Sequence, residues 1–99
     1  MIKERLEYKQ LILRLEEAEQ LAAQFSGGYS NNFISTEEFH TALSEKLIQL
    51  KEGETAELNK LWLWFAPTCD WDTLIREDGL VLGETIFALL SELKKECNI

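Results

Sequence analysis

The sequence is poor in the residues on which most catalysis and membrane insertion depend. Its 99 residues include one histidine, one proline and two cysteines, and 10 lysines and arginines stand against 18 aspartates and glutamates. No stretch approaches the roughly 20 consecutive apolar residues of a membrane helix. The first residues mix lysine, arginine and glutamate and lack the apolar segment of a secretory signal. We therefore expect one cytoplasmic domain, because 99 residues with 45% hydrophobic content suit a single core.

The scarcity of histidine and cysteine excludes most catalytic and metal sites. A nucleophilic Cys69 would need a base, and His40 is the one histidine that could serve. The carboxylates of Asp70 and Asp72 would oppose formation of a Cys69 thiolate. We interpret His40 as an ordinary surface or boundary residue of a helix rather than as a general base. The segment 70–75 begins like a calcium loop but has apolar residues where the loop needs an oxygen ligand and a glycine. We expect no enzyme activity, no cofactor and no bound metal.

The acidic balance gives a net charge of -8, which repels phosphate backbones and anionic lipid head groups. A basic protein is therefore the expected partner, rather than nucleic acid or a membrane. The carboxylates are unevenly placed. Residues 15–45 include Glu37 and Glu38 but no lysine or arginine, and Arg76 is the one cation in 70–84. A solvated face that keeps a small protein soluble would give the same distribution.

The spacing of apolar residues predicts an all-α, single-domain bundle. Tyr8 begins a stripe of apolar residues at three- and four-residue steps, and similar stripes recur along the chain. Ser35 or Thr36 should cap the second helix, because Ser35 and Glu38 have the spacing of a capping box. We expect four main helices and one short helix after Pro67. The predicted ranges are about 2–26, 36–52, 55–66, 71–78 and 84–97.

Three segments depart from the regular helical pattern. Residues 61–65 are bulky and partly suited to a strand, although the helix formers before them favour a helix. The loop after the first helix contains two glycines and carries Tyr29 and Phe33. These aromatic residues could fold back over the core or be presented to a partner. Residues 80–82 are expected to connect the short helix to the last one.

All three tryptophans and the single proline lie within 58–72. An apolar run stops there at Pro67 and gives way to an Asp-Trp-Asp triplet where the chain turns. Aromatic anchors ringed by charge are typical of protein interfaces, so we expect a partner to dock here. A core role for Trp62 and Trp64 is the alternative. The predicted partner-binding residues are Asp70, Trp71, Asp72, Glu77, Asp78 and Trp64, with a second patch of Glu37, Glu38 and Tyr29.

The segment 61–72 contains Phe-Ala-Pro-Thr-Cys followed by Trp-Asp and is similar to a Trp-rich segment of short, acidic bacterial proteins. In size, charge and helical content the whole chain resembles the α-helical immunity proteins of polymorphic and contact-dependent-inhibition toxin systems. The resemblance implies an antitoxin that binds and neutralises a cognate basic toxin domain, such as an RNase or another nuclease, by protein–protein contact. It carries over no particular site residue.

Two other functions fit the same residues. One is a non-catalytic regulatory interaction module. Location of the gene in a metabolic or transcription operon would favour this module, whereas a neighbouring gene for a large secreted protein would favour the antitoxin. The other is a phage-type inhibitor that imitates the charge of nucleic acid, and duplex DNA should compete with its binding. We expect a monomer, with dimerisation through the first helix as the alternative.

Overall fold

The structure, a computed structural model, describes residues 5–30 and 32–97 and is all-α over both ranges. Its elements are α1 (Leu6–Ala22), α2 (Thr36–Lys51), α3 (Leu58–Phe65), α4 (Asp70–Ile75), the 3-10 helix η2 (Arg76–Gly79) and α5 (Leu80–Cys97). The predicted all-α class is confirmed, and 61–65 is helical. No helix within the described ranges combines the length and the apolar character that crossing a lipid bilayer requires.

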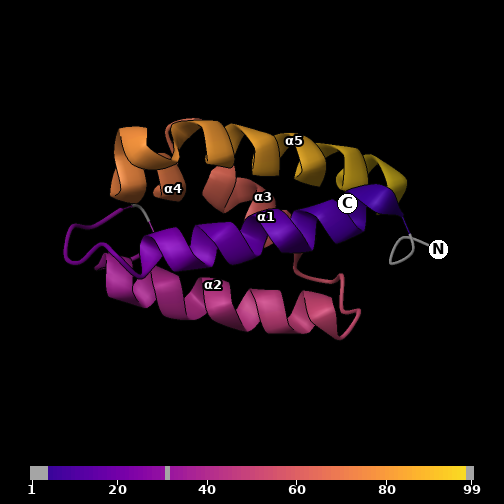
Figure 1. The fold of residues 1–99 in the computed structure, drawn as a ribbon, viewed down its shortest axis with the longest axis horizontal. Helices are drawn as coiled ribbons and strands as arrows, with labels where there is room; N and C mark the ends of the chain where they lie inside the picture. The colour runs from indigo at the N-terminus through magenta and orange to yellow at the C-terminus, as the bar shows by residue number, and fades with distance from the viewer. Residues whose placement is uncertain (1–4, 31, 98–99) are drawn as a thin grey trace.

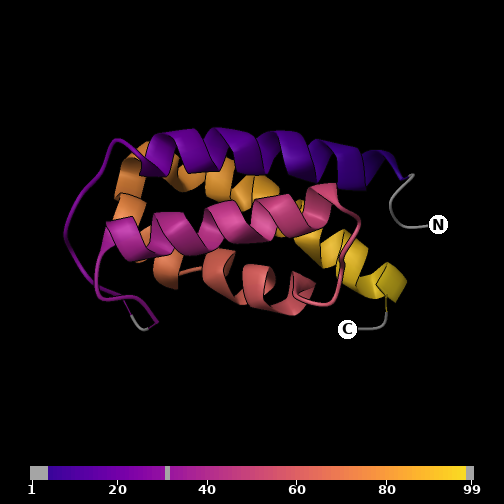
Figure 2. The same cartoon turned by 90° about the horizontal axis from the view of Figure 1, so that it is seen from below.

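The long helices alternate in direction along the chain, as in an up-and-down bundle (Figure 1). α1 lies between α2 and α5, and α3 with α4 completes the bundle behind them (Figures 1 and 2). The α1–α2 loop, α4 and η2 lie at one end of the bundle, which we call the loop end, and the α2–α3 connection lies at the other. Short connections favour this order because they join helices that run antiparallel.

The apolar stripes predicted from the sequence form the interior. At the loop end, the ring of Phe39 is the centre of an aromatic cluster, with centroid distances of 5.1 Å to Phe33, 5.8 Å to Trp64, 6.4 Å to Phe65 and 6.1 Å to Trp71. Edge-to-face and tilted ring pairs at such distances are favourable beyond the area that they bury. The buried stripe residues are Tyr8, Leu11, Leu15, Ala18 and Ala22 of α1, Phe39, Leu43, Leu47 and Leu50 of α2, Leu58, Leu61 and Phe65 of α3, and Ile86, Leu90 and Leu93 of α5.

The last helix begins at Leu80 rather than near residue 84, so the prediction that 80–82 form a connection is wrong. The sequence favoured a start near Gly83 because glycine is more common at helix ends than inside helices. In the structure a Cβ atom on Gly83 would lie 2.5 Å from Cδ1 of Trp71. Gly83 therefore lies inside α5 because its missing side chain lets the indole pack against the helix.

Three other boundaries differ from the predicted ones. α1 ends at Ala22 rather than at residue 26, and the N–H groups of Gln24 and Phe25 bond three residues back instead of four. α3 begins at Leu58, three residues later than predicted. The end of the predicted 71–78 helix is the separate element η2, because Arg76 has φ +63°, which an α-helix cannot continue. The predicted start of the first helix at residue 2 lies outside the described residues.

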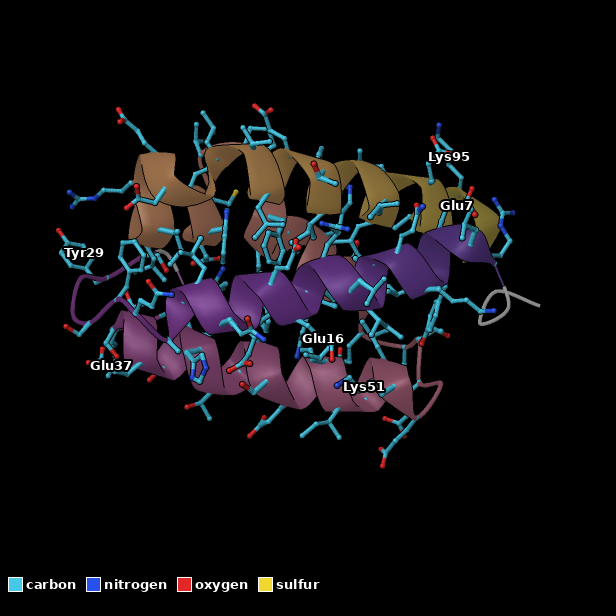
Figure 3. The ribbon with its side chains drawn as sticks, viewed as in Figure 1. Glu7, Glu16, Tyr29, Glu37, Lys51 and Lys95 are labelled. Atoms are coloured by element: carbon cyan, nitrogen blue, oxygen red, sulfur yellow. The ribbon has the colours of Figure 1, made fainter. Side chains whose placement is uncertain are left out.

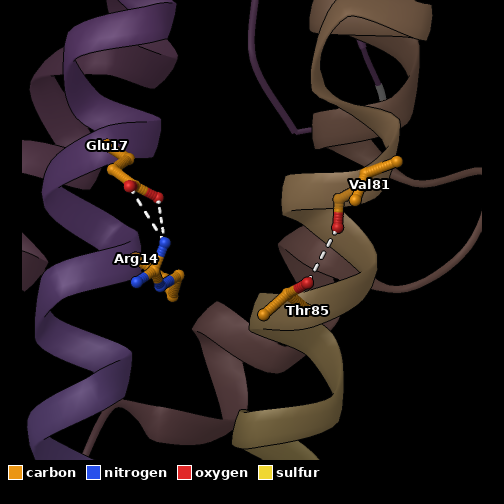
Figure 4. Close-up of polar contacts among 4 residues, drawn as sticks. All are labelled: Arg14, Glu17, Val81 and Thr85. Carbon is orange, nitrogen blue, oxygen red and sulfur yellow. Dashed lines mark hydrogen bonds and ion pairs between the residues drawn. The ribbon is translucent and has the colours of Figure 1, made fainter.

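The outer faces of α1 and α5 carry short-range contacts (Figure 4). On α1, Nη1 of Arg14 lies 2.9 and 2.8 Å from the two carboxylate oxygens of Glu17. On α5, the Thr85 hydroxyl donates to the backbone carbonyl of Val81 over 3.0 Å. Exposed pairs within one helix contribute only about 0.2–0.5 kcal/mol each. The arrangement of the bundle therefore depends on its apolar interior.

Candidate partner-binding surface

The Asp-Trp-Asp triplet does not form the exposed docking surface that we expected. Asp70 and Trp71 are 1% and 0% exposed, and Trp64 is 8% exposed within the aromatic cluster. The indole Nε1–H of Trp71 donates to the carbonyl of Gly79 over 2.8 Å, so its polar atom is also satisfied inside the protein. The expectation that these three residues are presented to a partner is wrong. An indole is largely apolar, and the glycines of η2 and α5 provide the space that buries it.

The buried carboxylate of Asp70 holds the α1–α2 loop against α4. Its Oδ1 accepts hydrogen bonds from the Ser30 hydroxyl and from the Asn32 backbone N–H at 3.1 Å, and its Oδ2 accepts from Nδ2 of Asn32 at 2.8 Å. A carboxylate removed from water needs donors of this kind. The donors lie 38 and 40 residues away in the chain, so no local pattern predicted the contact. Asp70 is a structural residue of the loop end.

Asp72 is half-exposed, and its Oδ2 accepts a hydrogen bond from the backbone N–H of Thr68 over 2.9 Å. The N-cap of α4 is Cys69, whose side chain makes no capping bond. The sequence also favours Asp70 or Asp72 as the cap of this helix, and that prediction is wrong because its N-cap residue is Cys69. Asp72 instead reaches back over the first turn and holds Thr68, which has φ +64°, a value that β-branched residues rarely adopt.

The remaining predicted residues gather at the loop end from three segments of the chain. Tyr29 is 79% exposed in the α1–α2 loop, Glu37 and Glu38 are exposed at the start of α2, and Glu77 and Asp78 are exposed on η2. Figure 3 places Tyr29 and Glu37 together at this end of the bundle. The other aromatic residue of the loop, Phe33, folds over the core and is 8% exposed. We call this the loop-end surface, and its residues are Tyr29, Glu37, Glu38, Arg76, Glu77 and Asp78.

Two neighbouring hollows shape the loop-end surface. The larger, of about 560 Å³, lies between residues 25–29 and α4, and Tyr29 lines it. The smaller, of about 480 Å³, is lined by Glu77 and Asp78. Phe25 and Arg76 line both hollows. The surface is therefore concave, and its lining carboxylates, Glu77 and Asp78, lie in the smaller hollow.

Glu37 fixes the loop from the α2 side. Its Oε1 accepts a hydrogen bond from the Gly27 backbone N–H over 2.9 Å, which holds the pKa of Glu37 below its ordinary value and favours its charged form. The Gly27 carbonyl in turn accepts from the backbone N–H and the hydroxyl of Thr36, both at 2.8 Å. Gly27 and Gly28 have φ of +74° and +71°, values that favour glycine. The loop that presents Tyr29 is thus held by Glu37 and Thr36 on one side and by Asp70 on the other.

Arg76 belongs to the surface although it was absent from the predicted binding residues. It is exposed, it lines both hollows, and its φ of +63° places it in a region that costs a non-glycine residue about 1–3 kcal/mol. The signal in the sequence was its isolation as the one cation among the carboxylates of 70–84. Arg76 is therefore the one basic residue of the loop-end surface, whose other charged residues, Glu37, Glu38, Glu77 and Asp78, are acidic.

His40 and Cys69, the catalytic candidates of the sequence, lie on α2 and at the N-cap of α4. The His40 ring is half-buried and pairs with the carboxylate of Glu19, and no hydrogen bond joins it to Cys69 among the described residues. Within 5–30 and 32–97, no group of three or more histidine, cysteine or acidic side chains is placed to hold a metal ion. Comparison of the chain with known protein families, curated proteins and solved structures finds no match. The exposure and charge of the loop-end surface are thus the features that point to a function.

Proposed function

We propose that this chain is a non-catalytic binding protein that neutralises a basic protein partner through the loop-end surface. In its most specific form, the chain is a cytoplasmic immunity protein and the partner is a toxin domain, such as a nuclease. The observation that supports the proposal best is that exposed residues from separate segments of the chain lie at one end of the bundle. Tyr29, Glu37, Glu38, Glu77 and Asp78 come from three segments of the chain and are exposed at the same end of the bundle, where Tyr29 lines one hollow and Glu77 and Asp78 line the neighbouring one.

Electrostatics supports a basic partner. The surface has four exposed carboxylates and one guanidinium, on a chain of net charge -8. Complementary potentials raise the association rate and exclude like-charged competitors. A nuclease that binds RNA or DNA has a basic cleft, and an acidic surface seated on it would block entry of the substrate. Neutralisation by this route needs no chemistry from the inhibitor.

The loop itself supports a binding role. Tyr29 and Ile34 are each 79% exposed, so the loop displays two large apolar side chains to water. Tyrosine is enriched among the residues that contribute most to interfaces. Because Asp70 and Glu37 already hold the loop, a partner would spend little free energy on ordering it. A fixed loop with an exposed aromatic side chain is suited to anchoring a partner.

Charge reversal at one end of the bundle tests the proposal. The test variant is Glu77→Lys with Asp78→Lys, and the matched control is Glu52→Lys with Glu54→Lys, two exposed carboxylates at the other end. Each tagged variant is used to capture proteins from the source cell, and the captured basic protein is then expressed alone and together with each variant. We expect the test variant to lose at least tenfold in affinity and to stop protecting cells, while the control behaves as the native chain.

Two results would overturn the proposal. Equal binding by both variants, with circular dichroism showing intact helices, would exclude the loop-end surface. A captured protein that is harmless when expressed alone would exclude the antitoxin role. If the captured protein binds DNA, is harmless when expressed alone and is released by duplex DNA, imitation of nucleic acid is favoured instead.

A further inference from the structure

A separate, smaller pocket opens between α3, α4 and α5. Its volume is about 160 Å³. A cavity of about 150 Å³ can hold benzene, whereas pockets for drug-sized ligands measure about 300–1,000 Å³. The pocket is therefore large enough for one side chain and too small for a cofactor. Its lining residues are Phe65, Pro67, Asp72, Leu80, Glu84 and Phe87.

The walls of this pocket are apolar and held in place by ring contacts. Phe65 is 2% exposed and forms the bottom, and its ring lies 5.0 Å from that of Trp71. The ring of Phe87 lies 5.2 Å from that of Trp62. Leu80 is 44% exposed and lies toward the mouth. A hydrocarbon chain that entered the pocket would contact these preformed walls without rearranging the core.

Two carboxylates complete the lining, and no cation does. The orientation of the Asp72 carboxylate is fixed, because its Oδ2 accepts a hydrogen bond from the Thr68 N–H over 2.9 Å. Glu84 is exposed on α5, and no ion pair to it is present among the residues that the structure describes. Lysine and arginine have an apolar stem and a charged end, and cations also interact favourably with aromatic faces. An apolar pocket with two carboxylates matches this combination.

We infer that the pocket receives one lysine or arginine side chain of the basic partner. The stem would lie against Phe65, Phe87 and Leu80, and the cation would lie between the carboxylates of Asp72 and Glu84. This inference rests on the proposed function for the nature of the partner. The pocket is distinct from the hollows of the loop-end surface. Asp72 of α4 lines the pocket, whereas Thr73, the next residue, lines the larger hollow. A partner seated on the loop end would thus have an anchoring point on a neighbouring face of α4.

The pocket can be tested without the partner by an NMR titration of the ¹⁵N-labelled full chain. The probes are N-acetyl-lysine amide, N-acetyl-arginine amide and N-acetyl-norleucine amide, the last of which keeps the stem of lysine and lacks the charge. We expect the cationic probes to bind with Kd of about 1–10 mM and at least fivefold more tightly than the norleucine probe. The largest shifts should occur at the amides of Leu80, Glu84 and Phe87.

Substitutions then identify the carboxylates. Asp72→Asn and Glu84→Gln should each reduce affinity for the cationic probes about threefold to fivefold and leave the norleucine probe unchanged. Glu52→Gln removes an exposed carboxylate at the other end of the bundle, outside the pocket, and is the matched control. Equal affinity for lysine and norleucine on the native chain, or largest shifts away from the pocket, would overturn the inference. If the pocket fails but charge reversal at Glu77 and Asp78 still abolishes partner capture, the proposed function stands without this anchor.

Discussion

The substitution Gly83→Ala sets local helix propensity against tertiary packing. Gly83 lies inside α5, and alanine in a helix interior is favoured over glycine by about 1 kcal/mol. Local propensity therefore predicts a more stable protein. The structure predicts the opposite, because the new Cβ would lie 2.5 Å from Cδ1 and 2.6 Å from Nε1 of Trp71. Carbon atoms in favourable contact are about 3.5–4.0 Å apart, so the indole would have to move by about 1 Å.

Trp71 has little room for that movement. It is 0% exposed, its ring lies 5.0 Å from that of Phe65, and its Nε1–H donates to the Gly79 carbonyl. Overpacking a core costs about 1–3 kcal/mol, and this crowded site belongs at the upper end. Weakening the indole hydrogen bond adds about 1 kcal/mol. After the gain in helix propensity, Gly83→Ala should lower the free energy of unfolding by about 3 kcal/mol and Tm by about 12–24 °C.

Thermal unfolding followed by circular dichroism measures the effect, and a double-mutant cycle with Trp71→Phe assigns its cause. The smaller ring should relieve the contact, so Gly83→Ala should cost about 1 kcal/mol or less in the Trp71→Phe background. Ala88→Gly, at an exposed position of the same helix, is the control and should cost about 1 kcal/mol from propensity alone. A Gly83→Ala protein with a Tm equal to or above that of the native chain would refute the reasoning.

Three further predictions concern the polar contacts of the loop end. Ser35→Ala should cost about 1 kcal/mol in thermal unfolding, because the Ser35 hydroxyl accepts the Glu38 N–H at 3.1 Å at the start of α2. Asp70→Asn should cost about 2–3 kcal/mol and speed amide exchange in the α1–α2 loop, since it replaces an acceptor of the Asn32 donors by an NH₂ group. The pKa of Glu37 is lowered by the Gly27 N–H, so its contribution to stability is present above the ordinary glutamate pKa of about 4.3 and is lost as pH falls through the lowered value. Glu37→Gln should remove the acid transition of the Gly27 amide in an NMR pH titration, and a transition that persists would contradict the assignment.

Much of the fold could be predicted because helix formation and helix capping depend on residues within about four positions of one another. The stripe from Tyr8 to Ala22 is buried as its spacing indicated, and Ser35 caps α2. The errors lie where a distant residue decides the local structure. Gly83 indicated a helix start by itself, yet it lies inside α5 because the Trp71 indole needs the space.

Composition and apolar period already specify a helical, acidic chain with few catalytic residues, because both are properties of the linear sequence. Which acidic and aromatic residues are exposed depends instead on the tertiary structure. It buried Asp70 under donors 38 and 40 residues away and left Tyr29 79% exposed. Burial depends on which segments meet in space, and the α1–α2 loop and α4 meet only when the bundle closes.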